Sequence, residues 1–424
     1  MNQAVLHTGC GAEAGLISVD EALALISVDE ALALIQTHTQ SLAHETLELQ
    51  HALGRYLAAD VHSQIQLPLF AQSAVDGYAI CAAGEIKAGT QFELIGEIRA
   101  GQTAETILKA GQAVRIFTGA PIPEGTTTVA RQEIVKADAQ QIELTSVLNK
   151  HADIRDAGEE FSVGQCLAVR GQKLTVGAIA ALSMAGISHC EVYAYPKVAV
   201  VITGDEVAQN IEDYRAGKIF DANAPLISAW FQSQHVQVEL IHIADEKQAV
   251  LDLFNRLKDS FDVILTTGGV SVGDYDFVRP AALDIGFQQI FWKVKQKPGK
   301  PMLFAEYKRE NSSSCYLLGL PGNSAAVYVG MQIYTDTLLK ALQGQTTPLD
   351  WFSGVITHDL KADARERFLR MSVRFEQGAV QLTNLAKQQS HMLSNLMQAN
   401  CLVRIPAGQS VQAGYLLQGL LIQQ

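Results

Sequence analysis

The chain has 424 residues, 48% of them hydrophobic, so it is long enough to bury several hydrophobic cores. Its formal net charge of −12 disfavours non-specific binding to nucleic acid or to an anionic membrane surface, and no apolar run approaches the roughly 20 residues of a membrane-spanning helix. The six cysteines include no Cys-x-x-Cys pair, which argues against a disulfide framework and a structural zinc site, and no basic residue of a secretory signal precedes Arg55. We therefore expect a soluble, cytoplasmic protein of several domains.

A tandem repeat lies near the N-terminus, where the nine residues ISVDEALAL occur at 17–25 and again at 26–34. In each copy a serine, Ser18 or Ser27, is followed three positions later by glutamate, which is the pattern of a capping box at a helix start. Nine residues correspond to two and a half helical turns, so the copies would face opposite sides of one continuous helix. We therefore interpret the repeat as a local duplication in which one copy is redundant.

The segment 65–155 contains short alternating runs, such as FELIGEI and AVRIFTG, between turns rich in Gly, Pro and Thr. This pattern predicts a small β-rich domain that is inserted into the chain. Residues 156–193 return to a mixed pattern, with a helix expected at 176–185. We expect this stretch to pack with residues 16–64 as one discontinuous N-terminal domain.

Residues 194–345 carry the clearest pattern, because the strand-like runs KVAVVIT, VELIHI, DVILTT and CYLLGL alternate with helical segments. Such alternation predicts βαβ units and a three-layer α/β/α domain with a mostly parallel sheet. In that architecture ligands bind at the carboxyl ends of the strands. Residues 346–424 read as strands and turns again, which predicts a small C-terminal β domain.

Acidic or glycine-rich loops follow all four strand-like runs. Gly204-Asp205-Glu206 follows the first run, Asp245 the second, TTGGVSVGDYD (266–276) the third and Pro321-Gly322-Asn323-Ser324 the fourth. Glycine-rich loops of this type commonly bind phosphate through backbone N–H groups. The third loop nevertheless ends in carboxylates that would repel a phosphate, Asp276 among them.

Carboxylates on three neighbouring strand ends favour a metal site. A single acidic residue at a helix N-terminus usually complements the helix dipole, and capping is the more common role for Asp245 taken alone. The four carboxylates of Asp205, Glu206, Asp245 and Asp276 beside a phosphate loop instead fit hard oxygen ligands around Mg²⁺. The repulsion is then resolved, because the carboxylates face the metal and the metal faces the phosphates.

A dense set of lysines in FWKVKQKPGKP (291–301) supplies the opposite charge. In an extended segment Lys293, Lys295 and Lys297 would point to the same side, and Lys300 follows a Pro-Gly turn. Lysines on an exposed edge strand can also serve only to prevent aggregation. Since the chain is acidic and the cluster lies close to the carboxylate loops, we favour an oxyanion-binding site.

Two further stretches have an unusual composition for an ordinary surface. LPLFAQSAVDGYAI places Asp76 before a glycine in an apolar segment, and RIFTGAPIPEGTTTVARQE, which contains Thr118, is long enough for a binding loop. Simple turn chemistry explains them about equally well.

Several motifs together resemble one family. SAVDGYA, RIFTGAPIPEG, DIRDAGEE, TGDE, TTGGVSVGDYD, KPGKP, GLPGN and ARERFLR occur in the order found in the molybdopterin molybdenumtransferases, the molybdenum insertases that include the gephyrin E domain. The resemblance covers the chain from about residue 16 to its end. It implies a four-domain homodimer with a barrel-like C-terminal domain and with an active site between the α/β domain of one subunit and the β-rich domain of the other. One departure is Ser324, which stands where the family usually has a helix-starting proline.

The resemblance also implies a reaction and its partners. The family's reaction takes adenylylated molybdopterin and molybdate, with Mg²⁺ as cofactor, and yields molybdenum cofactor and AMP. The implied partners are a molybdopterin adenylyltransferase and proteins that mature molybdoenzymes, with no role for nucleic acid or membrane.

The matching positions imply the site residues. The acidic, catalytic set is Asp205, Glu206, Asp245 and Asp276, of which the last three would hold Mg²⁺, while Asp76 and Thr118 would come from the β-rich domain of the second subunit. The implied substrate-binding residues are Gly268, Gly269, Ser271, Gly273, Lys293, Lys297, Lys300, Pro321, Gly322, Asn323, Arg365 and Ser390.

Two other functions compete with this interpretation. A molybdopterin adenylyltransferase shares the α/β domain and the TTGG loop, but that activity needs only the single α/β domain, and this chain is much longer. A non-enzymatic scaffold is the other alternative, which we rank last because the carboxylate set is intact and no appended interaction module is visible.

Overall fold

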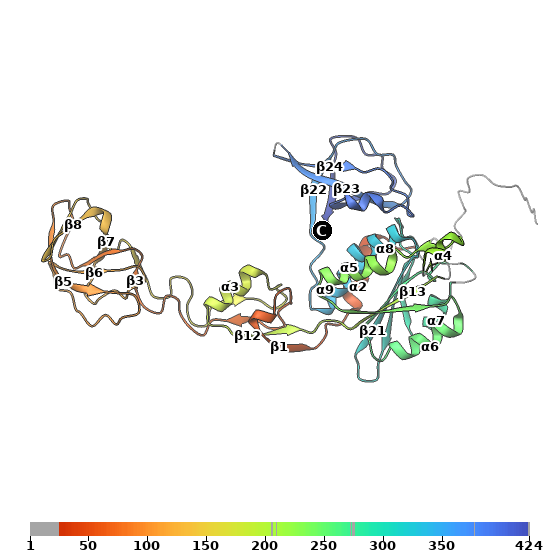
Figure 1. Ribbon diagram of the computed structural model, residues 1–424, viewed down its shortest axis with the longest axis horizontal. Coiled ribbons are helices and arrows are strands. Elements are labelled where there is room, and N and C mark those ends of the chain that lie inside the picture. Colours follow the sequence, from red (N-terminus) through yellow and green to blue (C-terminus); the bar gives the residue numbers. More distant parts are fainter. Residues whose placement is uncertain are drawn as a thin grey trace, which may run out of the picture. The chain divides into compact units, whose positions relative to one another are not determined.

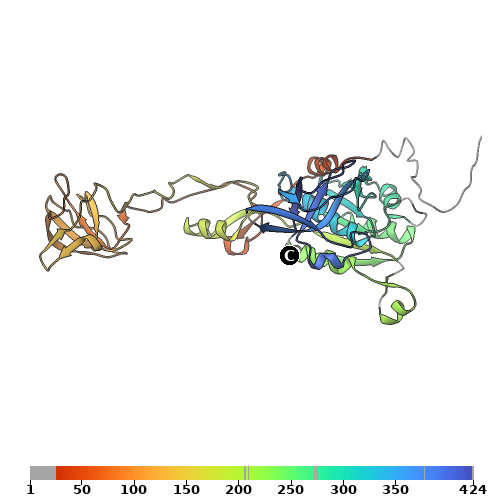
Figure 2. The same cartoon turned by 90° about the horizontal axis from the view of Figure 1, so that it is seen from above.

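The structure is a computed structural model that describes residues 25–204, 207–208, 210–271, 273, 276–376 and 378–422. The chain divides into two compact units, of which one is Glu45–Val192 and the other holds the described residues on either side of that segment. Figures 1 and 2 show both units coloured along the chain. Within these described ranges, no helix combines the length and the apolar character needed to cross a membrane.

The larger unit is built on a six-stranded sheet in the order β16-β13-β17-β21-β20-β18. The first four strands in this order run parallel to one another. They are β16 (Val238–Ile243), β13 (Val198–Thr203), β17 (Val263–Thr267) and β21 (Ser314–Leu320). Two antiparallel strands form the other edge of the sheet, namely β20 (Leu303–Lys308) and β18 (Gln288–Trp292). The sequence patterns did not predict these two strands separately. The mostly parallel sheet is therefore confirmed.

Helices cover both faces of this sheet (Figure 1). One face packs against α2 (Val28–His38), α5 (Asn223–Ser233), α8 (Ser324–Gly330) and α9 (Asp336–Leu342). The other face packs against α6 (Lys247–Leu257) and α7 (Val278–Asp284). Because neighbouring strand residues point to opposite faces, Val200 belongs to the first core and Val201 to the second. The predicted three-layer α/β/α arrangement is confirmed.

Helix α2 is formed by the second copy of the repeat. The Glu30 N–H donates to Ser27 Oγ at 3.2 Å and the Ser27 N–H donates to Glu30 Oε2 at 2.8 Å, so the predicted capping box is present. The helix begins within the second copy, because Ile26 forms a β-bridge with Val294 immediately before the cap. Residues 17–24 of the first copy lie outside the described residues.

The C-terminal part of this unit is a closed barrel, as the resemblance implied. Its strands are β22 (Trp351–Ile356), β23 (Glu366–Glu376), β24 (Ala379–Asn384), β25 (Cys401–Ile405) and β26 (Leu416–Leu421). They pair in the order β23-β24-β22-β26-β25, and the additional pairing of β23 with β25 closes the ring around a buried apolar core. The two-residue strand β19 (Gln296–Lys297) pairs with β23, which connects the barrel to the lysine-rich segment.

The smaller unit contains the β-rich sheet, which Figure 2 shows in orange tones. Its strand order is β7-β4-β6-β5-β9-β8, with bounds Thr128–Arg131, Gly77–Ile80, Gln112–Ile116, Gln91–Ile98, Gln141–Leu144 and Val135–Ala137. A second core surrounds helix α3 (Val176–Met184), where the sequence predicted a helix, with β2 (Val61–His62) and β11 (Cys166–Ala168) paired beside it. The four-domain division of the sequence analysis stays a prediction.

The remaining elements that the described residues form are short. They are β1 (His44–Glu48), β3 (Gln72–Ser73), β10 (Ile154–Arg155), β12 (His189–Tyr193), β14 (Val207–Ala208), α4 (Ile211–Arg215), β15 (Ile219–Phe220), a π-helical turn at Met331–Thr335, and 3-10 turns at Leu49–His51, Gln132–Ile134 and Ser394–Met397.

Candidate active site

A cavity of about 270 Å³ lies at the carboxyl ends of the four parallel strands. Parallel strands end at one edge of the sheet, so the loops that follow them meet there. Six of the predicted site residues line this cavity, namely Asp245, Gly268, Gly269, Gly273, Asp276 and Gly322. We call it the strand-end cavity. Ser271 is exposed and is not among its lining residues, and Asp205 and Glu206 lie outside the described residues.

The glycine loop shapes the strand-end cavity through two positions that only glycine suits. Gly268 has φ +87° and Gly269 has φ +65°, which is the left-handed region. A Cβ atom at Gly268 would lie 2.7 Å from Thr203 Oγ1, and one at Gly269 would lie 2.6 Å from Val278 Cγ2. The Gly268 N–H already donates to the Leu320 carbonyl at 2.9 Å, so this glycine contributes shape rather than a free donor.

Asp276 closes the same loop. Its Oδ2 accepts a hydrogen bond from the Gly273 N–H at 2.7 Å, and its own N–H donates to the Gly273 carbonyl at 3.1 Å. The carboxylate is therefore held in place by the loop while the residue lines the cavity. An asparagine could make the same bond without the charge, which makes Asp276 suitable for a charge test.

The polar residues Asp221 and Asn223 also line the strand-end cavity, and they were not among the predicted site residues. Asp221 Oδ1 accepts from the N–H groups of Asn223 at 2.8 Å and Ala224 at 3.1 Å, which are the first two residues of helix α5. Asn223 Nδ2 donates to the Gly322 carbonyl at 2.8 Å, whereas its Oδ1 is buried without a hydrogen-bond partner. Asp221 does not directly follow a predicted strand, so the search at strand ends did not find it, although it is the first residue of the helical run DANAPLISAWFQSQ in the sequence.

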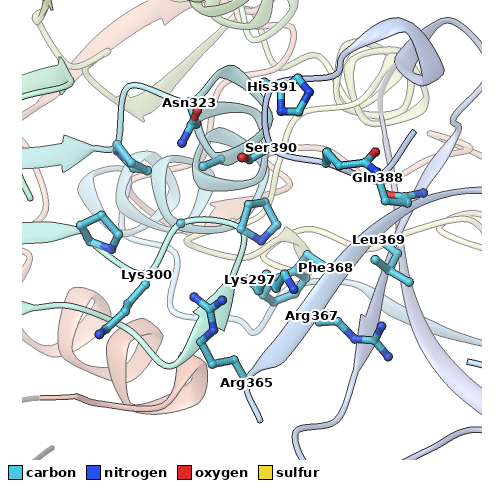
Figure 3. Close-up of a pocket in the computed structure, with 16 residues that line it drawn as sticks. Lys297, Lys300, Asn323, Arg365, Arg367, Phe368, Leu369, Gln388, Ser390 and His391 are labelled. Atoms are coloured by element: carbon cyan, nitrogen blue, oxygen red, sulfur yellow. The ribbon is translucent and has the colours of Figure 1, made fainter. Parts of the chain in front are cut away.

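A second cavity, of about 620 Å³, is lined by residues of the α/β domain and the barrel (Figure 3). Its cationic lining residues are Lys297, Lys300, Arg365 and Arg367, and we call it the cationic cavity. In Figure 3 these cationic residues lie on one side of the cavity, and Asn323, Ser390 and His391 lie on the other. Among the described residues that line it there is neither Asp nor Glu. Six predicted site residues meet here, namely Lys297, Lys300, Pro321, Asn323, Arg365 and Ser390.

The cations of this cavity differ in how far they are already neutralised. Lys297 Nζ lies 2.9 Å from Asp363 Oδ2, and this hydrogen bond holds the pKa of the Asp363 carboxyl below its usual range. Arg365 Nη1 makes only a long contact, 3.4 Å, to the Gln296 carbonyl. Arg367 donates from Nη2 to the Lys361 carbonyl, and its Nε is buried without a hydrogen-bond partner. Both arginines can therefore still bind an anion.

A buried glutamine fixes the KPGKP loop. Gln296 is fully buried, accepts from the Tyr334 hydroxyl at 2.5 Å and donates from Nε2 to the Gly299 carbonyl at 3.2 Å. In the β19–β23 pairing Gln296 lies opposite Glu366, and Lys297 lies opposite Arg367. The pairing with the barrel thus brings the lysine loop and the arginine strand together.

Lys293 does not follow the pattern expected of the lysine segment. It has φ +79°, it is only 4% exposed, and its Nζ lies 4.0 Å from the centroid of the Trp292 ring. The expectation that Lys293, Lys295 and Lys297 share one side is wrong, because this backbone turn interrupts the strand: Lys293 is buried, whereas Lys295 and Lys297 are exposed. Lys293 is not among the lining residues of either cavity.

Asp76 and Thr118 meet in the β-rich part of the smaller unit. Both the N–H and the hydroxyl of Thr118 donate to Asp76 Oδ1 at 2.8 Å. The backbone hydrogen bond, and then the hydroxyl, lower the pKa of the Asp76 carboxyl. The motifs SAVDGYA and RIFTG therefore meet in one exposed contact, in which the Asp76 carboxylate accepts two hydrogen bonds from Thr118.

The loop Pro321–Ser324 belongs to both cavities of the larger unit. Pro321 and Asn323 line the cationic cavity, whereas Gly322 and Ser324 line the strand-end cavity. Alternate residues of one short loop thus contribute to an acidic and to a basic site.

Comparisons with known proteins cover nearly the whole chain. Residues 26–186 match a family model described as "MoeA N-terminal region (domain I and II)", 199–341 match "Probable molybdopterin binding domain", and 353–421 match "MoeA C-terminal region (domain IV)". The crystal structure of the molybdopterin biosynthesis moeA protein from Pyrococcus horikoshii OT3 superposes with a TM-score of 0.80 at 24% identity, covering 94% of this chain and 100% of that one, which supports the fold.

Curated relatives identify the family. The molybdopterin molybdenumtransferase of Haemophilus influenzae is 33% identical over 368 residues, which are 85% of this chain and 89% of the relative. The enzyme of the same name from Bacillus subtilis is 30% identical over 392 residues, 90% of each chain. The resemblance seen in the motifs is thereby confirmed, and the chain belongs to the molybdopterin molybdenumtransferase family of transferases.

Proposed function

We propose that this transferase inserts molybdenum from molybdate into adenylylated molybdopterin and releases AMP, with Mg²⁺ as its cofactor. The observation that carries the proposal is the loop Pro321–Ser324, which contributes to an acidic and to a cationic cavity at once. A substrate with a phosphoanhydride at one end and a metal-accepting group at the other can extend along such a loop and occupy both sites.

The cationic cavity suits the molybdate dianion. Arg365 and Arg367 offer guanidinium donors that are only partly used, and Lys300 adds a positive charge. Charge-assisted hydrogen bonds of this kind bind tetrahedral oxyanions well. In the proposed reaction these residues bind molybdate and orient it toward the dithiolene sulfurs of the substrate, so no cysteine of the protein takes part.

The strand-end cavity suits the phosphoanhydride and Mg²⁺. Asp221, Asp245 and Asp276 line it, but no three carboxylate oxygens within its described part approach one another within 4.8 Å. Proteins usually hold Mg²⁺ with one or two carboxylates together with substrate phosphates, and the carboxylates that line this cavity fit that pattern. Asp245, Asp276 and Glu206 are the proposed ligands, and Mg²⁺, when bound, would neutralise charge on the phosphate oxygens.

We further propose a homodimer, in which the β-rich domain of a second copy supplies Asp76 and Thr118 to this site. The support is that Asp76 is ionised, exposed and held by Thr118 in a fixed orientation. An adenylyltransferase must supply the adenylylated substrate, and molybdoenzyme-maturation proteins must consume the product, so both remain proposed partners, and the cytoplasm remains the proposed location.

The proposal can be tested by giving the purified protein molybdopterin, adenylylated molybdopterin, ATP, molybdate and Mg²⁺ in separate combinations while AMP and ATP are quantified by chromatography. We expect AMP release only from adenylylated molybdopterin and only with molybdate present. Consumption of ATP with molybdopterin would instead identify an adenylyltransferase. Binding of molybdopterin without any turnover would identify a scaffold.

A further inference from the structure

We propose a second metal site, in the smaller unit, where Asp60, His62 and Cys166 bind a divalent cation of the zinc type. The carboxylate, imidazole and thiol each offer one ligand atom, and these three atoms all lie within 4.8 Å of one another. This site is independent of the proposed function, since it uses none of the residues that line the two cavities of the larger unit.

Strand pairing explains why the three side chains converge. Asp60 immediately precedes strand β2 and His62 ends it, so these side chains, two positions apart, lie on the same face of the segment. Cys166 of β11 lies directly opposite His62 in the antiparallel pairing, and opposite residues also share a face. The intervening Val61 and the next residue Leu167 instead pack against the apolar core. The three potential ligands therefore form one exposed cluster on the outer face.

The carboxylate is already oriented toward the paired strand. Asp60 Oδ1 accepts a hydrogen bond from the Arg170 N–H at 2.7 Å, just beyond the end of β11. Cys166 Sγ makes only a weak contact, 3.5 Å, to the Ala168 carbonyl, which a metal bond would readily replace. Two exposed side chains and one anchored carboxylate can adjust without disturbing the core.

The spacing fits tetrahedral coordination after a small adjustment. Zinc bond lengths of about 2.0–2.3 Å place two tetrahedral ligands roughly 3.5 Å apart. The present limit of 4.8 Å therefore requires movements of about 1 Å, which rotations of exposed side chains supply. A thiolate and an imidazole favour Zn²⁺ or Co²⁺ over Mg²⁺ or Ca²⁺, and three protein ligands leave a fourth position for water.

Cys166 is also the cysteine best suited to metal binding among those that the structure describes. Cys190, Cys315 and Cys401 are buried, and burial raises the pKa of the Cys315 and Cys401 thiols to about 12. Cys81 is only partly exposed, whereas Cys166 is exposed. The spacing of cysteines in the sequence argued against a zinc site, but a mixed Asp-His-Cys site depends on strand pairing, which spacing does not reveal.

The test uses Co²⁺ as a spectroscopic probe on the full chain in a Cys10→Ser, Cys81→Ser background. Cys10 is replaced because it lies outside the described residues. Titration of the metal-free protein should give a thiolate-to-cobalt absorption band that saturates at one equivalent and is displaced by Zn²⁺. Cys166→Ser should abolish this band, and His62→Ala and Asp60→Asn should each weaken Co²⁺ binding at least tenfold.

His51→Ala is the matched control, because His51 is an exposed histidine of the same unit and is not in the cluster. This variant should bind Co²⁺ as the background protein does, and circular dichroism should show that every variant is folded. Absence of the band at millimolar Co²⁺ would overturn the proposal. So would a band that survives Cys166→Ser, or one that is lost in Cys166→Ser but unchanged in both His62→Ala and Asp60→Asn, since a lone thiol would then explain the binding.

Discussion

Asp276 is the residue at which the charge of the strand-end cavity can be tested most directly. Asp276→Asn keeps the acceptor for the Gly273 N–H but removes a negative charge from the cavity. We expect AMP release to fall by roughly a hundredfold or more, because losing about 3 kcal/mol of transition-state stabilisation has that effect. Excess Mg²⁺ should restore part of the rate.

Asp284→Asn is the control for this change. Asp284 lies on helix α7, which follows the same loop, and pairs with Lys247 at the surface. It should release AMP at the normal rate, and calorimetry should show that Asp276→Asn loses Mg²⁺-dependent nucleotide binding while Asp284→Asn keeps it. Near-normal turnover of Asp276→Asn would leave Asp276 with a loop-closing role only.

Lys297 tests the cationic cavity. Lys297→Ala removes a cation from the cavity and leaves the Asp363 carboxylate without its lysine partner. We expect the half-saturating molybdate concentration to rise roughly tenfold, with a much smaller change in nucleotide affinity, because the lost charge belongs to the oxyanion site. Steady-state kinetics with molybdate and with adenylylated molybdopterin varied separately would measure both effects.

Two further variants sharpen this test. Lys295→Ala removes another exposed lysine of the same segment, one that does not line the cavity, so molybdate dependence should stay normal. Asp363→Asn added to Lys297→Ala should recover part of the lost affinity, since it removes the unpaired carboxylate. If nucleotide binding falls instead while molybdate dependence is unchanged, the lysine serves the other anion.

At the scale of elements, the repeat makes a clear prediction about helix α2. Ser27 caps this helix by accepting from the Glu30 N–H. Ser27→Ala should therefore lower the free energy of unfolding by about 1 kcal/mol. Ser18→Ala, the equivalent change in the first copy, should have no effect, because we interpret that copy as redundant. Thermal unfolding of both variants would show the contrast, and equal losses would contradict the redundancy.

An ionic contact joins helix α2 to barrel strand β25. Arg404 is largely buried and contacts both Glu366 of β23 and Asp29 of α2. Arg404→Met should cost about 3 kcal/mol, because it leaves the largely buried Glu366 carboxylate without its arginine partner. Asp29→Asn should cost less than about 1 kcal/mol, because 71% of the Asp29 side chain is exposed to solvent.

The pH dependence of this contact follows from the direction in which the pKa of Asp29 is shifted. The hydrogen bond from Arg404 lowers the pKa of the Asp29 carboxyl in the folded protein. The stability that Asp29 contributes is therefore present above its unfolded pKa of about 4 and is lost as the pH falls through the lower folded value. The difference in unfolding temperature between wild type and Asp29→Asn should be measurable at pH 7 and vanish near pH 2; a difference that grows in acid would contradict this linkage.

At the scale of the whole molecule, the proposed homodimer predicts complementation between inactive variants. If Asp76 serves the α/β domain of a second copy, co-expressed Asp76→Ala and Asp276→Ala chains should form mixed dimers with one intact site. Random pairing would then restore about a quarter of the wild-type activity. Mixed dimers that are purified through separate tags should show about half of the wild-type activity, because each keeps one intact site of two.

A matched mixture distinguishes shared from separate sites. Asp245 and Asp276 line the same cavity of one chain, so co-expressed Asp245→Ala and Asp276→Ala should restore nothing. A fully active monomer in sedimentation, or equal recovery in both mixtures, would remove the idea of a shared site.

Much of the fold follows from local sequence patterns. The apolar runs that became β13, β16, β17 and β21 and the helical runs between them needed only period and composition to be recognised. The sequence patterns did not reveal the antiparallel edge formed by β18 and β20, because the pairing partner of a short strand depends on contacts between distant parts of the chain. The same limit hid β19, whose two residues, Gln296–Lys297, form a strand only because β23 lies beside them.

The sequence by itself determined the family, the order of the motifs and the three-layer sheet whose strand ends hold Asp245 and Asp276, because these depend on residue types at fixed local spacing. Only the tertiary structure decided that Asp221 joins them, that Lys293 is buried beside Trp292, and that alternate residues of Pro321–Ser324 line two cavities. It also brought Cys166 beside His62 across a strand pair. These outcomes depend on backbone turns and on packing between segments far apart in the chain, which local periodicity does not encode.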